Sequence, residues 1–167
     1  MRELNHEHIF RFPFDENNGL DLDSILPGLQ KASLPFKMDE KLKSRVASLG
    51  ERYLSKGDTL LHGDFYPGSW ISTESGLKVI DPEFGFVGDR EFDLGIFVAH
   101  LIFSGLNENE ALSKLDNYNP SFDSSLTLAF AGVELLRRLI GIAQLPLDLS
   151  LKERVELLQL GRKMLLA

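Results

Sequence analysis

The chain has 167 residues, of which 43% are hydrophobic and 26% are charged; it contains no cysteine and carries a formal net charge of −7 at pH 7. These values predict a folded domain with a core of its own, and they exclude wholesale disorder, disulfide bonds and thiolate metal sites. The acidic charge disfavours a nucleic-acid-binding protein, and no apolar run predicts a signal peptide or a membrane span. We therefore expect one cytoplasmic domain over residues 1–167, without nucleic-acid or membrane partners.

The first third of the chain is predicted to combine loops with one helix. Residues 1–36 contain three prolines and two turn signals, which predict short helical turns and loops. Apolar residues recur at helical spacing over 38–56, and Asp39 is a suitable N-cap for a helix there. Residues 59–62 then predict a short strand that enters a loop at 63–68.

Two strands are predicted next, over 70–72 and 77–80, because the Thr-Glu-Ser-Gly sequence between them favours a turn. This hairpin is expected to return Asp81 to the end of the sheet at which Asp64 lies. Asp64 follows one apolar run, and Asp81 and Glu83 follow another. The pattern therefore predicts that three carboxylates converge at one end of a small hairpin.

Helices are predicted for the rest of the chain. Residues 92–104 are apolar on nearly all sides, which indicates a helix at the centre of the core. Capping residues begin a short helix over 107–115 and a last helix over 150–166, and a long helix is predicted between them over 124–145. The predicted fold class is α+β, predominantly α, with one small β-hairpin that carries the acidic loops.

The three carboxylates suit phosphoryl transfer, which requires positioning of an acceptor hydroxyl and neutralisation of phosphate charge. Asp64 can accept a hydrogen bond from a hydroxyl and hold it in line with a γ-phosphate. Asp81 and Glu83 offer the hard oxygen ligands that Mg²⁺ prefers, and residues two apart on an extended strand point to the same face. These residues predict a site for Mg²⁺, ATP and a small-molecule hydroxyl acceptor.

Three motifs in this region occur in the order found in a known enzyme superfamily. They are His-Gly-Asp-Phe-Tyr-Pro-Gly-Ser at 62–69, Ile-Asp-Pro-Glu at 80–83 and Gly-Asp-Arg-Glu-Phe-Asp-Leu-Gly at 88–95. Together they resemble the catalytic loop, the metal-binding segment and the following Gly-Asp element of the aminoglycoside phosphotransferase/choline kinase superfamily. The resemblance extends over about 59–145 and implies the C-terminal lobe of a protein-kinase-like fold.

Within that superfamily the chain resembles the methylthioribose kinase-like small-molecule kinases. It shares their serine in the catalytic loop, their Asp-Pro-Glu-Phe sequence and their twin arginine, here Arg137 and Arg138. The resemblance implies that both arginines contact the substrate or the transferred phosphate. Because adjacent residues point about 100° apart on a helix, we expect at most one of them to face the site squarely. The alternative is a solvated pair at a helix surface.

The resemblance also implies roles for the acidic loops. Asp64 is implied to be the catalytic base, and Asp81 and Glu83 are implied to be the Mg²⁺ ligands. Ser69 is implied to join these two carboxylates in binding the cofactor, since it replaces an asparagine of related enzymes. A hydroxyl is a weaker neutral donor than an amide oxygen, so the cation is expected to depend more on Glu83.

Four further side chains are predicted to be structural or without a role in chemistry. His62 is expected to brace its loop through backbone hydrogen bonds. Asp93, at the start of a helix, is expected to accept backbone N–H groups of the catalytic loop. His6 and His8 lie two residues apart in a polar terminal segment, where disorder is a better prediction than a pair of metal ligands.

The implied activity is ATP- and Mg²⁺-dependent phosphorylation of a hydroxyl on a sugar, thio-sugar or aminoglycoside-like molecule. Tyr66 and Trp70 depart from the family's pattern, which leaves the acceptor open. No phosphate-covering loop or strand lysine of the kinase type precedes Asp64, so we expect the N-terminal ATP-binding lobe to be absent from this chain.

Two classes of function therefore stand beside each other. The first is a small-molecule kinase, active when it is complete. The second is a non-catalytic binding or interaction module derived from a kinase C-lobe, whose uncovered apolar surface would bind an N-lobe chain or a second copy. A hydrolase is disfavoured because the sequence contains no Gly-x-Ser-x-Gly nucleophile elbow.

Overall fold

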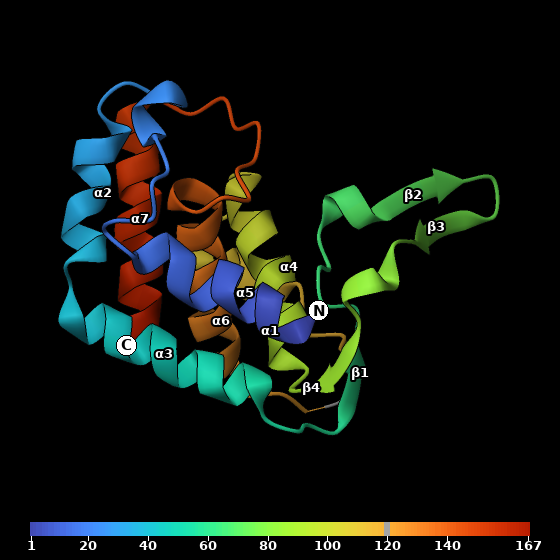
Figure 1. Ribbon diagram of the computed structural model, residues 1–167. Helices are drawn as coiled ribbons and strands as arrows, with labels where there is room; N and C mark the ends of the chain where they lie inside the picture. Colours follow the sequence, from blue (N-terminus) through green and yellow to red (C-terminus); the bar gives the residue numbers. More distant parts are fainter. Residues whose placement is uncertain (119–120) are drawn as a thin grey trace.

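The computed structural model describes residues 1–118 and 121–167 and is mainly helical (Figure 1). Its α-helices are α1 (Arg2–His6), α2 (Leu29–Lys37), α3 (Glu40–Leu54), α4 (Glu91–Phe103), α5 (Glu108–Ser113), α6 (Ser124–Ile140) and α7 (Leu151–Leu166). Two antiparallel sheets pair β1 (Thr59–Leu61) with β4 (Phe86–Gly88) and β2 (Trp70–Thr73) with β3 (Gly76–Val79). The predicted fold class, α+β and predominantly α, is confirmed. Among the described residues, no helix combines the length and the apolar character needed to cross a membrane.

The core lies where α6 packs against α4 and α7. Nearly every residue of α6 is buried, so this helix is enclosed on all sides. A Cβ on Gly132 of α6 would lie 2.6 Å from the carbonyl oxygen of Gly161 of α7, and one on Gly95 of α4 would lie 2.6 Å from Cβ of Phe130. Both distances are shorter than van der Waals contact, so the glycines let three helices approach closely. The result is a rigid centre for the helical body.

The helix starts predicted from polar residues are confirmed. Asp39 caps α3 with its carboxylate, and capping boxes begin α5 and α7. The helix predicted over 124–145 is shorter in the structure, because α6 ends at Ile140. The chain leaves the helix at Gly141, where a Cβ would lie 2.5 Å from the carbonyl oxygen of Arg137.

The N-terminal segment is more regular than predicted. α1 continues into a π-helical turn over Glu7–Arg11, and α2 forms although Pro35 lies inside it. Phe10 and Phe14 of this segment are buried in the main core, each with 3% of its surface exposed. Burial of these side chains outweighs the local preference of prolines and turn residues for loops.

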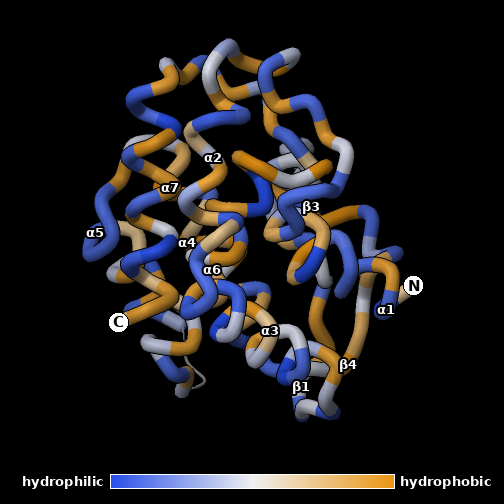
Figure 2. Tube along the Cα trace, turned by 60° about the vertical axis from the view of Figure 1, so that its left-hand side comes forward, coloured by the Kyte–Doolittle hydropathy of each residue, from blue (hydrophilic) through white to orange (hydrophobic). Residues whose placement is uncertain are grey.

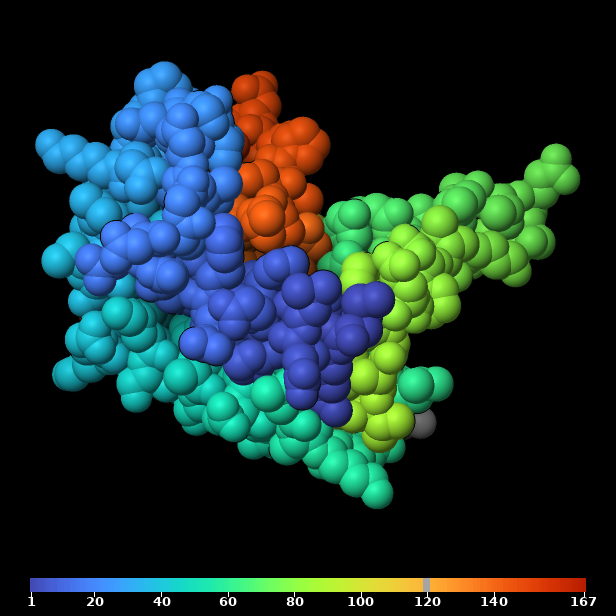
Figure 3. Space-filling view, in the orientation of Figure 1, coloured from blue at the N-terminus to red at the C-terminus, as the bar shows by residue number. Residues whose placement is uncertain are grey.

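The hairpin of β2 and β3 projects from the helical body (Figures 1 and 3). Trp70 pairs with Val79 at its base, which confirms the predicted pair of strands and the turn between them. Apolar side chains are exposed along it, with 45% exposure for Ile71, 65% for Leu77 and 49% for Val79. The hairpin therefore presents apolar surface instead of burying it.

The pairing of β1 with β4 was not predicted. Leu60 lies opposite Val87 in this sheet, and Figure 2 shows hydrophobic residues along both strands. Leu61 is buried in the core, whereas Leu60 and Val87 are 79% and 45% exposed. Because β1 precedes the acidic loops and β4 follows them, the sheet holds both ends of that segment against the helical body.

Candidate active site

A cleft of about 160 Å³ lies between the N-terminal segment, the loop after β1 and the end of α6. The loop contributes Asp64, the end of α6 contributes Arg137 and Arg138, and the N-terminal segment contributes Asn5 and His8. Apolar side chains complete the lining, namely Ile9, Phe84, Ile142 and Ala143. In Figure 3 the N-terminal segment lies beside the chain that returns from the hairpin. The cleft therefore joins one carboxylate and two guanidiniums to an apolar wall.

Asp64 contacts both members of the twin arginine. Its Oδ1 accepts a hydrogen bond from Nη2 of Arg138 at 2.9 Å and another from Nη2 of Arg137 at 3.4 Å. Each arginine has only 6% of its surface exposed. The prediction that at most one arginine faces the site is therefore wrong, and the alternative of a solvated surface pair is also wrong.

The two arginines converge because Glu134, one turn earlier on α6, holds both of them. Its carboxylate accepts hydrogen bonds from Nε of Arg138 at 2.8 Å and from Nε of Arg137, and it lies 3.1 Å from Nε2 of His100. Burial raises the pKa of Glu134, but the two guanidiniums outweigh burial and hold that pKa well below its usual range. With both Nε atoms engaged, the Nη atoms are directed toward the cleft.

The backbone of the loop after β1 is held by Asp93 at the start of α4. Oδ2 of Asp93 accepts the N–H of His62 at 2.6 Å, and Oδ1 accepts the N–H of Gly63 at 3.0 Å. Gly63 has a φ of 86°, and a Cβ there would lie 2.2 Å from the carbonyl oxygen of Phe84, so the turn requires glycine. Burial raises the pKa of Asp93, although the two N–H donors favour its charged form.

His62 and Ser69 connect this loop to the hairpin. Nε2 of His62 lies 2.8 Å from the carbonyl oxygen of Ile80, and the N–H of Ile80 donates to the carbonyl oxygen of Ser69 at 2.9 Å. The hydroxyl of Ser69, which is 4% exposed, donates to the carbonyl oxygen of Asp64 at 2.9 Å. Ser69 thus stabilises the shape of the loop, and its role in cofactor binding stays a prediction.

Asp81 and Glu83 are placed differently from Asp64. Both are exposed, on the segment between β3 and β4. Asp81 has a φ of 65°, in the left-handed region that most side chains avoid. Within the part of the chain that the structure describes, no group of three or more His, Asp or Glu side chains could hold a metal ion. The structure therefore does not gather the three acids into one metal site, and a site of Asp81 with Glu83 stays a prediction.

Three residues of the cleft come from a segment for which no site was predicted. Asn5, His8 and Ile9 are spaced by three and four residues, which is the spacing of one helix face. That signal was available, but the prolines and turn residues downstream favoured loops. The prediction of disorder at His6 and His8 is wrong, because both lie in helical turns and His6 packs on Phe10 with ring centroids 5.6 Å apart.

Two buried residues behind the arginines were also not predicted. Glu134 precedes Arg137 and Arg138 by three and four residues, a spacing at which opposite charges meet on a helix, so this pairing was detectable. His100 lies on another helix, and only the packing of α4 against α6 brings it to Glu134. The side chain of Tyr66 completes this group, because Cζ of Arg138 lies 4.8 Å from the centre of its ring.

Comparison with known families covers the part of this site that contains Asp64 and the hairpin, and the match ends before Glu134, Arg137 and Arg138. The model of the phosphotransferase enzyme family matches residues 6–130, which is more than half of the chain. The match includes the loop after β1, the hairpin and α4. The chain therefore belongs to the phosphotransferase enzyme family.

Individual relatives within this family are methylthioribose kinases. The methylthioribose kinase of Exiguobacterium sibiricum is 31% identical over an alignment of 175 residues, and this alignment covers 84% of this chain and 44% of that protein. The methylthioribose kinase of Bacillus pumilus is 30% identical over 176 residues, with the same coverage of 84% and 44%. That of Bacillus mycoides is 27% identical over 207 residues and covers 99% of this chain and 52% of the relative. The chain thus spans about half the length of the curated relatives it matches.

Proposed function

We propose that this chain is the acceptor- and metal-binding part of a kinase that uses Mg²⁺ and ATP to phosphorylate a hydroxyl on a small molecule. The observation that carries the proposal is the contact of Asp64 with Arg137 and Arg138 inside a cleft. Phosphoryl transfer needs a group that orients the acceptor hydroxyl and cations that stabilise the charge on the phosphoryl oxygens. Membership of the phosphotransferase family supports the same class of reaction.

In this proposal Asp64 acts on the acceptor through its second oxygen. Its Oδ1 already receives both guanidiniums, so Oδ2 is the oxygen left for a hydroxyl. As the hydroxyl oxygen bonds to the γ-phosphorus, the bond from that phosphorus to the β,γ-bridging oxygen breaks, and the hydroxyl proton passes to Asp64. The products are the phosphorylated acceptor and ADP. In this proposal Arg137 and Arg138 stabilise the negative charge on the oxygens of the transferred phosphoryl group.

The residues that would hold Mg²⁺ are Asp81 and Glu83. Their carboxylates are exposed, and kinases typically bind Mg²⁺ through one or two carboxylates together with the phosphates of the nucleotide. That mode does not need the three-residue metal group that is absent from the described residues. The left-handed backbone of Asp81 also supports a functional role, since such strain concentrates at active sites. When bound, the ion would neutralise charge on the phosphates.

The proposed acceptor is methylthioribose or a similar thio-sugar. The first support is the name of the relatives, which are methylthioribose kinases. The second is the lining of the cleft, which places apolar side chains such as Phe84 and Ile142 beside the charged groups. A thio-sugar has hydroxyls for the polar side and a thioether for the apolar side.

The proposal is tested with the 167-residue chain, millimolar ATP, Mg²⁺ and methylthioribose, with the product followed by ³¹P NMR. Loss of a general base typically slows a reaction by about 10²- to 10⁴-fold, so Asp64→Asn is expected to abolish measurable transfer. Asp58→Asn is the matched control, because its side chain is 79% exposed in the turn before β1. Transfer by Asp64→Asn at the wild-type rate would reject the proposed role of this carboxylate.

A binding or interaction module without catalysis is the second candidate. It is favoured by the apolar side chains that stay exposed on both small sheets, such as Leu60, Leu77 and Val79. A separately supplied N-terminal ATP-binding lobe, or a second copy of this chain, would cover them. Calorimetry that detects no Mg²⁺-ATP binding at millimolar nucleotide, together with light scattering that detects a dimer, would favour this candidate over the kinase.

A further inference from the structure

We propose that the N-terminal helical segment selects the acceptor, with Asn5 and His8 binding its hydroxyl groups and Ile142 contacting its apolar substituent. This inference rests on the proposed function of the cleft and adds the residues that distinguish one alcohol from another. Asp64 and the arginines act on any hydroxyl that reaches them, so they do not determine which molecule enters.

The geometry places the segment at the site of reaction. Asn5, His8 and Ile9 occupy one face of the helical segment, and all three line the same cleft as Asp64 and Arg138. An acceptor whose hydroxyl reaches Asp64 must therefore lie against this face. The family match begins at residue 6, so it includes His8 and Ile9 but not Asn5.

The segment is anchored like part of the core. Ile9 is 6% exposed and Phe10 is 3% exposed, and the ring of Phe10 lies 5.3 Å from that of Tyr53 and 6.4 Å from that of Phe130. These contacts hold the segment against α3 and α6. His8 is thus presented to the cleft from a fixed support, which is what recognition of one acceptor requires.

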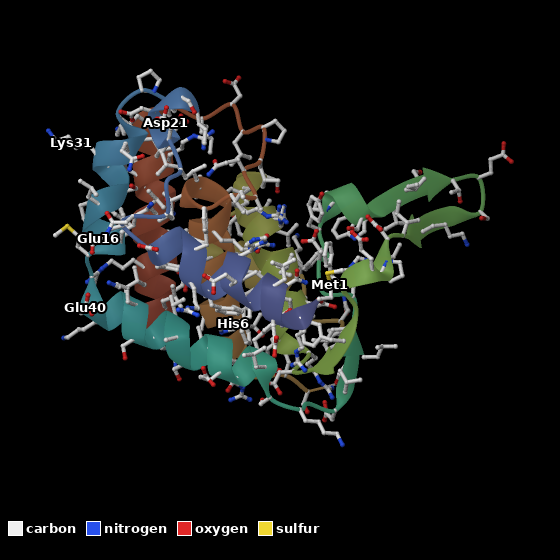
Figure 4. All side chains as sticks on the ribbon, in the orientation of Figure 1. Met1, His6, Glu16, Asp21, Lys31 and Glu40 are labelled. Carbon is white, nitrogen blue, oxygen red and sulfur yellow. The ribbon has the colours of Figure 1, made fainter. Side chains whose placement is uncertain are left out.

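The backbone of this segment has the form that often accompanies a binding site. Glu7–Arg11 is a π-helical turn, which is rare in proteins and occurs frequently at functional sites because the wider turn changes the direction of its side chains. His8 and Ile9 both lie in this turn and both reach the cleft. The neighbouring His6 instead faces α3, where its Nε2 would lie 2.6 Å from a Cβ on Gly50 (Figure 4).

The chemistry of the lining defines the class of acceptor. An amide and an imidazole both carry hydrogen-bonding atoms, which suits the hydroxyls of a polyol. The charges of Arg137 and Arg138 are balanced by Asp64 in the cleft and by Glu134 behind it, so the cleft offers no net negative charge to attract a cationic amine. Ile142 also lines the cleft, is 51% exposed and is available to an apolar substituent. The predicted acceptor is therefore a neutral polyol with an apolar group, and not an aminoglycoside.

The test measures dissociation constants of the 167-residue chain for methylthioribose, ribose and kanamycin by calorimetry. Wild-type protein is expected to bind methylthioribose more tightly than ribose and to bind kanamycin least. Asn5→Ala and His8→Ala are each expected to weaken binding of both sugars about three- to tenfold, the effect of one lost neutral hydrogen bond. Ile142→Ala is expected to reduce only the preference for methylthioribose, since the apolar contact is absent with ribose.

Glu7→Gln is the matched control. Glu7 belongs to the same π-helical turn, but its carboxylate pairs with Arg11 at 3.3 Å outside the cleft, so sugar binding is expected to stay unchanged. Circular dichroism establishes that each variant is folded. A second readout uses wild-type protein alone, in which methylthioribose is expected to shift the ring signals of His8 in ¹H–¹³C NMR spectra but not those of His6.

The outcomes separate this inference from the proposed function. Wild-type affinity for methylthioribose in His8→Ala and Asn5→Ala, with weakened affinity in Arg138→Lys, would overturn the inference and leave the proposed function standing. Tighter binding of kanamycin than of methylthioribose would overturn the predicted acceptor class. Absence of saturable binding of methylthioribose by the wild-type chain would overturn both. If an alanine variant does not fold, the His8 ring signals in wild-type protein decide the question.

Discussion

The two halves of the candidate site differ in how they are supported. Asp64 contacts two nearly buried arginines, and Glu134 holds those arginines from inside the helical body. Asp81 and Glu83 are exposed and follow a hairpin whose own apolar side chains are exposed. One half is therefore built into the core, whereas the other projects from it.

This difference indicates where preorganisation ends in the isolated chain. A side chain is held in a productive position when buried neighbours fix its rotamer, which is the situation of the arginines that contact Asp64. The segment that carries Asp81 and Glu83 is contacted at the base of the hairpin, where Nε2 of His62 lies 2.8 Å from the carbonyl oxygen of Ile80. We call Asp64 with its two arginines the proposed acceptor half, and Asp81 with Glu83 the proposed metal half. We expect the acceptor half to function as a rigid binding site. The metal half is expected to depend on nucleotide, Mg²⁺ and any further chain.

The largest expected effect comes from breaking the support of the acceptor half. Glu134→Gln would remove the buried carboxylate that pairs with both guanidiniums and leave them only the contact with Asp64, so it is expected to lower the free energy of unfolding by about 3–5 kcal/mol. Urea unfolding measures this change. Glu108→Gln is the control, because it removes a surface pair with Lys163 that is worth less than about 1 kcal/mol. Equal losses in the two variants would contradict the central role of Glu134.

Glu134 is also expected to make this half sensitive to acid. Its pKa in the folded protein lies below the ordinary value of 4.5, so at acid pH the unfolded chain binds a proton that the folded chain does not. The stabilisation from Glu134 is therefore present above the ordinary pKa of 4.5, and it is lost progressively as pH falls below 4.5. For this single group the loss is about 2 kcal/mol between about pH 5 and about pH 3, which urea unfolding at each pH detects.

A second buried carboxylate also contributes to the pH dependence of stability, so the titration of Glu134 itself must be followed. Asp93 acts in the opposite direction, because its raised pKa favours the folded state as pH falls. The ¹³C signal of the Glu134 carboxyl group isolates the group of interest and is expected to stay constant over the same pH range. A midpoint at the ordinary pKa in that signal would show that the guanidiniums do not hold Glu134 in its charged form.

A smaller effect of opposite sign is expected in the metal half. Asp81→Gly relieves a left-handed backbone and is expected to raise the free energy of unfolding by about 1 kcal/mol while weakening Mg²⁺-dependent ATP binding. Asp81→Asn is the control, since asparagine adopts this conformation readily but lacks the charge. Calorimetry is expected to show weaker binding in both variants, and thermal unfolding is expected to show a gain only in the glycine variant. Stability lost in Asp81→Gly would mean that the side chain is structural.

The smallest effect is expected on the projecting hairpin. Leu77 is 65% exposed, so Leu77→Thr is expected to change the free energy of unfolding by less than about 0.5 kcal/mol. Leu135→Ala is the comparison in α6, where the side chain is fully buried and its loss is expected to cost about 2–5 kcal/mol. A loss above about 1 kcal/mol in Leu77→Thr would show that the hairpin packs on a partner.

Much of the fold could be predicted because its signals are local. Asp39 marks the start of α3, capping boxes mark α5 and α7, and a turn sequence marks the β2–β3 hairpin; each forms between residues a few positions apart. The family was also visible locally, in three short motifs within residues 62–95, which lie in the loops around the hairpin and at the start of α4. The errors fall where burial of distant residues overrides local preference, as at Phe10 in a segment predicted to be irregular.

The sequence by itself determined the helices, the hairpin and the set of acids and arginines available for chemistry, because spacing and capping act within a few residues. Only the tertiary structure decided how those groups meet. It brought His100 to Glu134, turned both Arg137 and Arg138 to Asp64, and left Asp81 outside that cluster. The physical reason is that a buried charge takes its position from whichever partners the packed helices bring within hydrogen-bond distance, and those partners lie far along the chain.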